Sequence, residues 1–261
     1  MTSVRDGQAP PVDRRALRKR GVAAPGGGGE VAARADRETA RRLRLLNAIA
    51  ATAFAIGGSA FVAGAILAQG DVGPPRLAAA VYLFGGVFFS TGGYASVLQV
   101  INAPRQVAAD GGLHAEPFRW MALEPQRLDW SSAFALFAGT LFFGASLLNA
   151  LIGDLSPAQA DRLVWSPEFV GCLLFILSGH LALTEMHRDR PRGRRTDLGW
   201  WIVVVNQLGS FLFLVAAFAA FVRPATGDEV AVGIANWGTL TGALCFAVAG
   251  VMQEFERPEP A

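Results

Sequence analysis

Uncharged stretches long enough to cross a lipid bilayer dominate the chain from residue 45 onward. Residues 45–70, 77–104, 130–153, 198–222 and 230–253 contain no Asp, Glu, Lys or Arg, and residues 163–184 contain only Glu168. A helix needs about 20 mostly apolar residues to cross a hydrocarbon core of ~30 Å. Helices buried in a soluble bundle would carry a polar face, and these segments do not. The pattern predicts an all-α integral membrane protein with six transmembrane helices.

The charged residues predict how these helices are oriented. Of the 23 Lys and Arg residues, 20 lie in the segments 1–44, 102–129, 185–199 and 254–261, which share one side of the membrane. Because cytoplasmic loops are enriched in Lys and Arg, we expect both termini in the cytoplasm of a bacterial cell, with the protein in the cytoplasmic membrane. The chain is 52% hydrophobic and 17% charged, a composition that excludes a disordered protein and a nucleic-acid partner.

The basic segment before the first predicted span carries 11 Lys and Arg against 5 Asp and Glu. We expect it to be disordered through Gly29 and helical from Glu30, where Glu38 and Arg42 are spaced to pair along a helix. Such a tail either attracts anionic lipid or serves as the positive-inside signal of the first span.

A spacing of small and aromatic residues recurs three times. Spans two, four and six share the pattern G-x3-F-x3-G-x5-[QE], and spans one, three and five share a looser Gly-Ser/Thr pair. The first pattern comprises Gly85, Phe89, Gly93 and Gln99; Gly171, Phe175, Gly179 and Glu185; and Gly242, Phe246, Gly250 and Glu256. The pairs are Gly58-Ser59, Gly139-Thr140 and Gly209-Ser210. The chain is therefore predicted to form three parallel-repeat helical hairpins.

The spacing also predicts how each hairpin packs. Residues four apart lie on one face of a helix, and small residues let membrane helices approach closely. We expect each repeated Phe to pack over the Gly of its partner helix, so that Phe89, Phe175 and Phe246 cover Gly58, Gly139 and Gly209. In the alternative, the glycines line a path for a solute.

The last position of the pattern places Gln99, Glu185 and Glu256 at the cytoplasmic ends of three helices. An acid at a helix C-terminus opposes the helix dipole, and Arg105, Arg188 or Arg257 are candidates to compensate it. We interpret these side chains as solvated helix ends; the alternative is an inner polar ring that gates a cytoplasmic mouth.

The stretch Asn206–Phe255 resembles the YrhK-type family of short bacterial membrane hairpins. The resemblance rests on Gly209-Ser210, on Gly242-Ala-Leu-Cys-Phe246 and on Gly250, and residues 82–104 are similar. It implies a membrane hairpin that recurs three times, with the middle unit the most divergent. It implies no activity, because the biochemical role of the family is unassigned.

Candidate chemistry is sparse. His180 and His187 lie seven residues apart on the fourth span, a spacing that could ligate haem, although a structural histidine is the simpler interpretation. The sequence contains no CxxC pair and no nucleotide-binding, zinc-protease or serine-hydrolase motif. Ser166-Pro167 predicts the start of the fourth span, which would place Glu168 in its first turn near the outer interface. We therefore predict no catalytic residues, no metal and no cofactor.

The predicted organisation is a tail (1–44), hairpins at 45–104, 130–187 and 200–256, an interfacial loop (105–129), a basic loop (188–199) and a C-terminal tail (257–261). The absence of charge at mid-membrane argues against an ion-coupled carrier. We expect a non-enzymatic structural or interaction protein, with a second copy or another membrane protein as the possible partner. The alternatives are a channel or carrier for a small neutral solute and a haem or redox protein that uses His180.

Overall fold

The computed structural model describes residues 14–23, 33–74, 76–105, 107–108, 112–189 and 197–256, and its dominant elements are six long helices. These are α2 (Arg37–Gly70), α3 (Leu77–Ile101), α4 (Leu128–Ile152), α6 (Ser166–Asp189), α7 (Leu198–Ala219) and α8 (Val232–Gln253). The short elements are α1 (Arg14–Arg20), β1 (Val22–Ala23), β2 (Ala33–Arg34), α5 (Pro157–Ala160) and a π-helical turn, η1 (Asp161–Trp165). Six helices are long and apolar enough to cross a membrane, which confirms the predicted number of spans.

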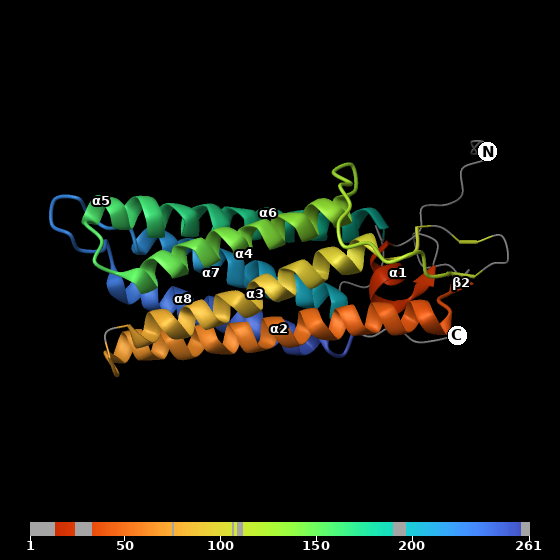
Figure 1. The fold of residues 1–261 in the computed structure, drawn as a ribbon, viewed down its shortest axis with the longest axis horizontal. Coiled ribbons are helices and arrows are strands. Elements are labelled where there is room, and N and C mark those ends of the chain that lie inside the picture. The colour runs from red at the N-terminus through yellow and green to blue at the C-terminus, as the bar shows by residue number, and fades with distance from the viewer. Residues whose placement is uncertain are drawn as a thin grey trace.

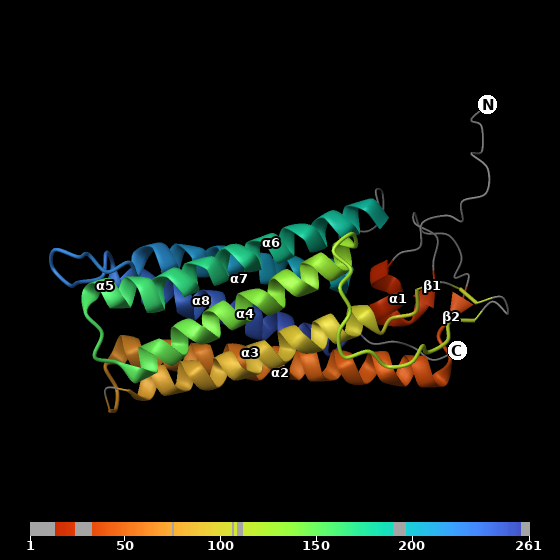
Figure 2. The same ribbon diagram turned by 45° about the horizontal axis from the view of Figure 1, so that its top comes forward.

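The six helices run alongside one another in an elongated bundle (Figures 1 and 2), and their contacts form a closed ring of neighbours. Along the ring, α2 packs on α3, α3 on α4, α4 on α6, α6 on α7 and α7 on α8, and α8 returns to α2. The helix α1 and the last described residues after α8 lie at the same end of this bundle. We call this end the α1 end and the opposite end the far end.

The helix pairs α2–α3, α4–α6 and α7–α8 meet through the same reciprocal contact. In α4–α6, a Cβ added at Gly139 would lie 2.8 Å from the Phe175 ring, and one added at Gly171 would lie 3.3 Å from the Phe143 ring. The corresponding contacts are Gly57 with Phe89 and Gly85 with Phe61 in α2–α3, and Gly209 with Phe246 and Gly242 with Phe213 in α7–α8. In each pair, both helices therefore contribute a glycine and, four residues later, a phenylalanine that covers the partner's glycine.

The first pair differs from the predicted register by one residue. Phe89 covers Gly57, whereas a Cβ at Gly58 would collide with the backbone of Ala247 on α8. Ser59 consequently faces outward and is exposed, while Thr140 and Ser210 are buried. The Gly-Gly sequence at 57–58 offers two alignments, and the position of Phe61 four residues after Gly57 selects the correct one.

The third glycine of each pattern joins neighbouring pairs around the ring. A Cβ at Gly93 would lie 3.1 Å from Cα of Phe137, one at Gly179 would meet the side chain of Gln207, and one at Gly250 would lie 2.6 Å from the Ala55 nitrogen. These three neighbours lie two residues before Gly139, Gly209 and Gly57 respectively. The same close approach thus connects α3 to α4, α6 to α7 and α8 to α2.

Six phenylalanines fill the middle of the bundle. Three come from α2, α4 and α7 and approach one another with ring centroids 5.5–6.2 Å apart: Phe61, Phe143 and Phe213. Three come from α3, α6 and α8 and lie one turn nearer the α1 end: Phe89, Phe175 and Phe246. All six are buried. Edge-to-face and offset contacts of this kind add to the packing of small residues, and together these rings close the axis at mid-bundle.

Two predicted helix starts are wrong. The fourth span begins at Pro157, where Ser156 and Gln159 form a capping box, and not at Ser166, whose hydroxyl donates to the carbonyl oxygen of Asp161. The intervening π-helical turn accommodates Pro167, which cannot donate a backbone hydrogen bond. The first long helix begins at Arg37 rather than at Glu30, because the Asp36 carboxylate accepts from the Thr39 N–H and caps the helix there.

The tail also differs from the prediction. Residues 14–20 form α1, and β1 pairs with β2 in a short antiparallel hairpin, whereas disorder was expected through Gly29. The expected disorder of residues 1–13 and 24–29, the tail 257–261 and most of the loop 188–199 lie outside the described residues.

Candidate functional site: a polar ring that holds a basic helix

The three side chains at the last position of the repeated pattern are buried at the α1 end of the bundle. Their exposed fractions are 1% for Gln99, 4% for Glu185 and 9% for Glu256. Our interpretation of these positions as solvated helix ends is therefore wrong. The reason is α1, which lies across the end of the bundle and contacts all three. We call these three residues the polar ring.

Two carboxylates of the polar ring pair with arginines of α1. Arg18 donates to both oxygens of Glu185 at 2.5 and 2.6 Å, and Arg15 donates to Glu256 at 2.7 Å. Bidentate contacts of this kind are the strongest ion pairs that proteins form. Although burial opposes a charge on Arg18, the adjacent Glu185 raises the pKa of Arg18 above its ordinary value. The cations that balance the acidic helix ends thus come from α1, and not from Arg105 or Arg188 as expected, while Arg257 lies outside the described residues.

The third member of the polar ring meets α1 through neutral groups. The Gln99 amide donates to the carbonyl oxygens of Arg18 and Leu43, at 3.4 and 3.3 Å. Beside it, Lys19 donates to Asn47 Oδ1 at 2.9 Å. Burial lowers the pKa of Lys19 to about 7, an effect that the charge of Glu256 partly offsets. The first hairpin therefore receives a lysine where the other two receive arginines.

A second set of positions completes the inner surface. Ten residues before Gly57, Gly139 and Gly209 stand Asn47, Asp129 and Gly199, all buried. Asn47 contacts Lys19, Asp129 lies 3.7 Å from Arg18, and a Cβ at Gly199 would lie 2.9 Å from Arg15 Nε. One basic side chain of α1 thus faces each of the three helix pairs.

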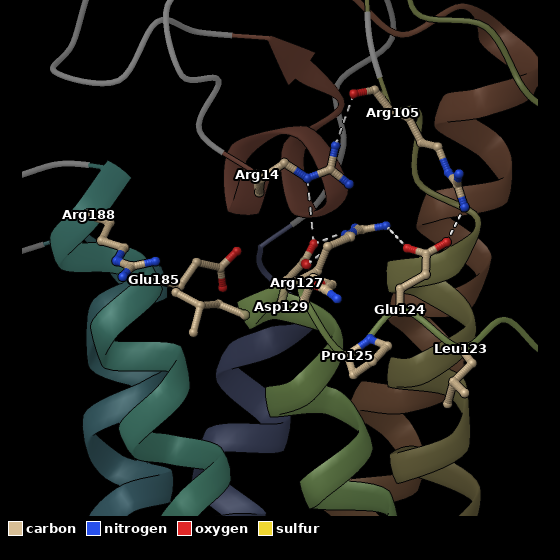
Figure 3. Close-up of a pocket in the computed structure, with 11 residues that line it drawn as sticks. Arg14, Arg105, Leu123, Glu124, Pro125, Arg127, Asp129, Glu185 and Arg188 are labelled. Atoms are coloured by element: carbon tan, nitrogen blue, oxygen red, sulfur yellow. Dashed lines mark hydrogen bonds and ion pairs between the residues drawn. The ribbon is translucent and has the colours of Figure 1, made fainter.

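Asp129 anchors an open groove beside α1, shown in Figure 3. Arg127 donates to both of its oxygens, at 3.1 and 2.7 Å, and Arg14 approaches at 3.6 Å. Glu124 pairs with Arg127 and Arg105 on the other side of the groove. The groove has a volume of about 780 Å³. Side chains of both charges line the groove. Their ion pairs connect α1 to the loop before α4, because Arg14 of α1 and Arg127 of that loop both approach Asp129.

Apolar contacts hold α1 in place from its other side. Leu17 packs in a buried cluster with Leu43 of α2, Leu113 of the long loop and alanines of β1 and β2. Ala35 donates its N–H to the carbonyl of Gly21, and Ala35 bridges Leu113. The segment 14–20 is stabilised as a helix because Leu17 packs in this apolar cluster while Arg15, Arg18 and Lys19 face the polar ring. A helix of seven residues is unstable alone, so these contacts determine whether it forms.

A partly enclosed cavity of about 120 Å³ lies between α1 and the phenylalanines. Arg15, Arg18 and Lys19 form its α1 side, and Phe54, Phe175 and Phe246 contribute to its floor. Neutral polar side chains line its wall: Ser96, Gln99, Ser132, Ser178, Asn206, Ser210 and Gln253. A cavity of this size and polarity has room for several water molecules or a small solute.

The other candidates lie apart from this site. The side chains of His180 and His187 are exposed on the outer surface of α6, and Cys172 and Cys245 are free cysteines. Within the described part of the chain, no three His, Cys, Asp or Glu side chains gather as a metal site. In the interfacial loop, Trp120, Met121 and Leu123 are exposed but not helical.

The sequence pattern identified the three positions of the polar ring, but they were interpreted as solvated helix ends and their contact with α1 was missed. The signal for α1 was present: Arg15, Arg18 and Lys19 recur at helical spacing, with Leu17 on the opposite face. One turn of periodicity inside a basic, Gly-rich tail is too short to distinguish from a solvated segment.

Comparisons of the chain with protein-family models, with curated proteins and with solved structures give no match, so the resemblance to YrhK-type hairpins rests on its short motifs alone.

Proposed function

We propose that this protein is a non-enzymatic interaction module of the bacterial cytoplasmic membrane. Its cytoplasmic end is a receptor for a short basic helix, and the chain's own α1 occupies that receptor. The observation that carries the proposal is that Gln99, Glu185 and Glu256, which share one repeat position, all bond to α1. A buried, shaped ring that recognises arginines fits binding better than catalysis, because its polar groups are engaged by the protein itself.

The proposal includes a threefold arrangement of hairpins, α2–α3, α4–α6 and α7–α8. The reciprocal glycine–phenylalanine contact within each pair and the recurring close approach between pairs support it. It also places both termini in the cytoplasm, because the α1 end carries most of the Lys and Arg residues. Exposed cations at that end would face anionic lipid, and they include Arg20, Arg34, Arg37, Arg41 and Arg44.

A cleavage experiment tests whether the polar ring is a receptor. A site for a specific protease is inserted between residues 24 and 32 of the full-length protein in detergent, and the protein is cut and repurified. We expect the fragment that carries α1 to remain bound without a covalent link. The variant Glu185→Gln/Glu256→Gln should release it, because both buried arginines lose their partners.

Glu38→Gln/Glu116→Gln is the matched control, since Glu38 pairs with Arg42 and Glu116 with Arg119 outside the ring. This variant should retain the fragment. Loss of the fragment from the cut wild-type protein would show that the polar ring is not a receptor for α1.

The second candidate is a conduit for a small neutral solute, and the polar cavity on the axis is the observation that favours it. The two layers of phenylalanine beyond the cavity argue against it in this conformation. Cysteines at Ser178 and Ser210, in a background without Cys172 and Cys245, distinguish the two functions. Labelling by an impermeant thiol reagent added from the far end would favour the conduit, and protection from that end favours the interaction module.

A further inference from the structure

We propose that the partly enclosed cavity beneath α1 binds a small monovalent inorganic anion of the size of chloride, between Lys19 and the neutral polar wall. The site rests on the proposed docking of α1, because α1 supplies its cations.

Cations outnumber carboxylates at the α1 end. Five buried or half-buried cations meet there, namely Arg14, Arg15, Arg18, Lys19 and Arg127. Three buried carboxylates face them: Asp129, Glu185 and Glu256. Glu124 also pairs with Arg127, but it pairs with Arg105 as well. Among the described residues, the cluster therefore carries an excess of positive charge in a largely buried region.

Among these five cations, Lys19 makes no ion pair with a carboxylate of the described residues, although the charge of Glu256 acts on it. Glu185 is engaged by both guanidinium nitrogens of Arg18, and Glu256 is engaged by Arg15. Among the described residues, the hydrogen-bond partner of Lys19 is the amide oxygen of Asn47, which also accepts from Gln253. A buried ammonium with a neutral partner is costly, and an anion beside it removes that cost.

The wall of the cavity can complete the coordination of such an anion. Hydroxyl and amide groups solvate a halide through hydrogen bonds without adding charge. Asn206 and Gln99 bring amides, and Ser96 and Ser210 bring hydroxyls that now donate to carbonyls of their own helices. The Nε of Arg15, which also lines the cavity, is buried without a hydrogen-bond partner. The volume of about 120 Å³ accommodates a halide with a few waters.

The site should bind its anion more weakly as the pH rises. The charged groups around Lys19 are Arg15 and Arg18 on its own helix, Glu256 on the segment after α8, Glu185 on α6 and Asp129 on α4. The flanking α2 and α3 present the neutral Asn47 and Gln99. Because the pKa of Lys19 is about 7 without an anion, the amine must take up a proton when the anion binds at higher pH. The dissociation constant should rise about tenfold per pH unit above 7.

The test is the melting temperature of the full-length protein in detergent, titrated with sodium chloride against sodium gluconate at constant ionic strength. We expect a saturable rise with chloride in the wild type. Lys19→Met removes the cation, and Asn47→Asp places a carboxylate against Lys19, so both should abolish the chloride-dependent rise. Arg37→Met, which removes an exposed cation of α2, should retain it. A saturable chloride response of wild-type size in Lys19→Met and Asn47→Asp would overturn the site.

Docking of α1 is measured on the same samples, through the distance between spin labels at Arg20→Cys and Arg41→Cys in the cysteine-free background. A single narrow distance together with no chloride response would reject the anion site and leave the receptor proposal standing. A broad distance distribution in the wild type would reject both.

Discussion

Arg18 and Glu185 form a two-pronged ion pair across 167 residues of sequence. It joins the centre of α1 to the end of α6, and both side chains are almost completely buried. Because the pair is held on both sides by buried groups, neither charge can recover its hydration if the other is removed. The consequences for docking can be measured directly.

Glu185→Gln should weaken the docking of α1 by about 3–5 kcal/mol, the usual cost of leaving one member of a buried pair without its partner. The spin-label pair at positions 20 and 41 reports this as a broadened distance distribution. The double variant Arg18→Met/Glu185→Met should be less damaging than Glu185→Gln, because no buried charge is left unpaired. Equal damage in both variants would mean that the charges themselves do not matter.

Gly139→Ala should lower the free energy of unfolding by about 1–3 kcal/mol, because the new methyl group would lie 2.8 Å from the Phe175 ring and 3.1 Å from the Gly171 carbonyl oxygen. Gly144→Ala on the same helix is the control, since its nearest neighbour outside the helix would be Ser90 Oγ at 4.0 Å. Folded yield and melting temperature in detergent compare the two. Similar values for both variants would contradict the packing contact.

The six spans could be predicted from the sequence because they depend on a pattern of apolar residues that extends over many positions. The register of Gly57 and Gly58 could not be predicted, since two adjacent glycines are equivalent until a neighbouring ring selects one. The start of α5 at Pro157 was missed because a π-helical turn separates it from Pro167, and nothing in the local composition marks such a turn. The docking of α1 depends on contacts with α6 and with the segment after α8, more than 160 residues away.

Docking of α1 should strengthen as the pH rises above 7, when chloride is replaced by gluconate. The pKa of Lys19 is about 7 in the docked state and near its ordinary value of 10.5 when α1 is released. The released state therefore binds more protons between these values, so raising the pH favours the docked state; below pH 7 the dependence ends. Lys19→Met should remove this pH dependence, as followed by the spin-label distance between pH 6 and about 10. An unchanged slope in Lys19→Met would assign the titration to another group.

Phe246→Ala should destabilise the bundle by about 3–5 kcal/mol, because Phe246 contacts the rings of Phe89, Phe175 and Phe213 and leaves a cavity when truncated. Phe84→Ala is the control, since its ring is mostly exposed on the outer face of α3. Thermal unfolding of the two variants in the same detergent gives the comparison. A milder effect at Phe246 than at Phe84 would contradict a packed aromatic centre.

If the three helix pairs are repeats, as we propose, then a single helix bound to their ring creates a mismatch of symmetry. If the hairpins were identical, α1 could bind in three equivalent orientations related by rotations of 120°, and the protein molecules would divide among these orientations. The proposed repeats differ where it matters, with Gln99 against two glutamates and with Asn47, Asp129 and Gly199 beneath them. Only one orientation of α1 pairs Arg15 and Arg18 each with a carboxylate and places Lys19 beside the amide side chains of Asn47 and Gln99. The differences among the hairpins thus select one orientation of α1. If the three hairpins were made identical at these positions, we expect α1 to bind in three orientations while the bundle stays folded.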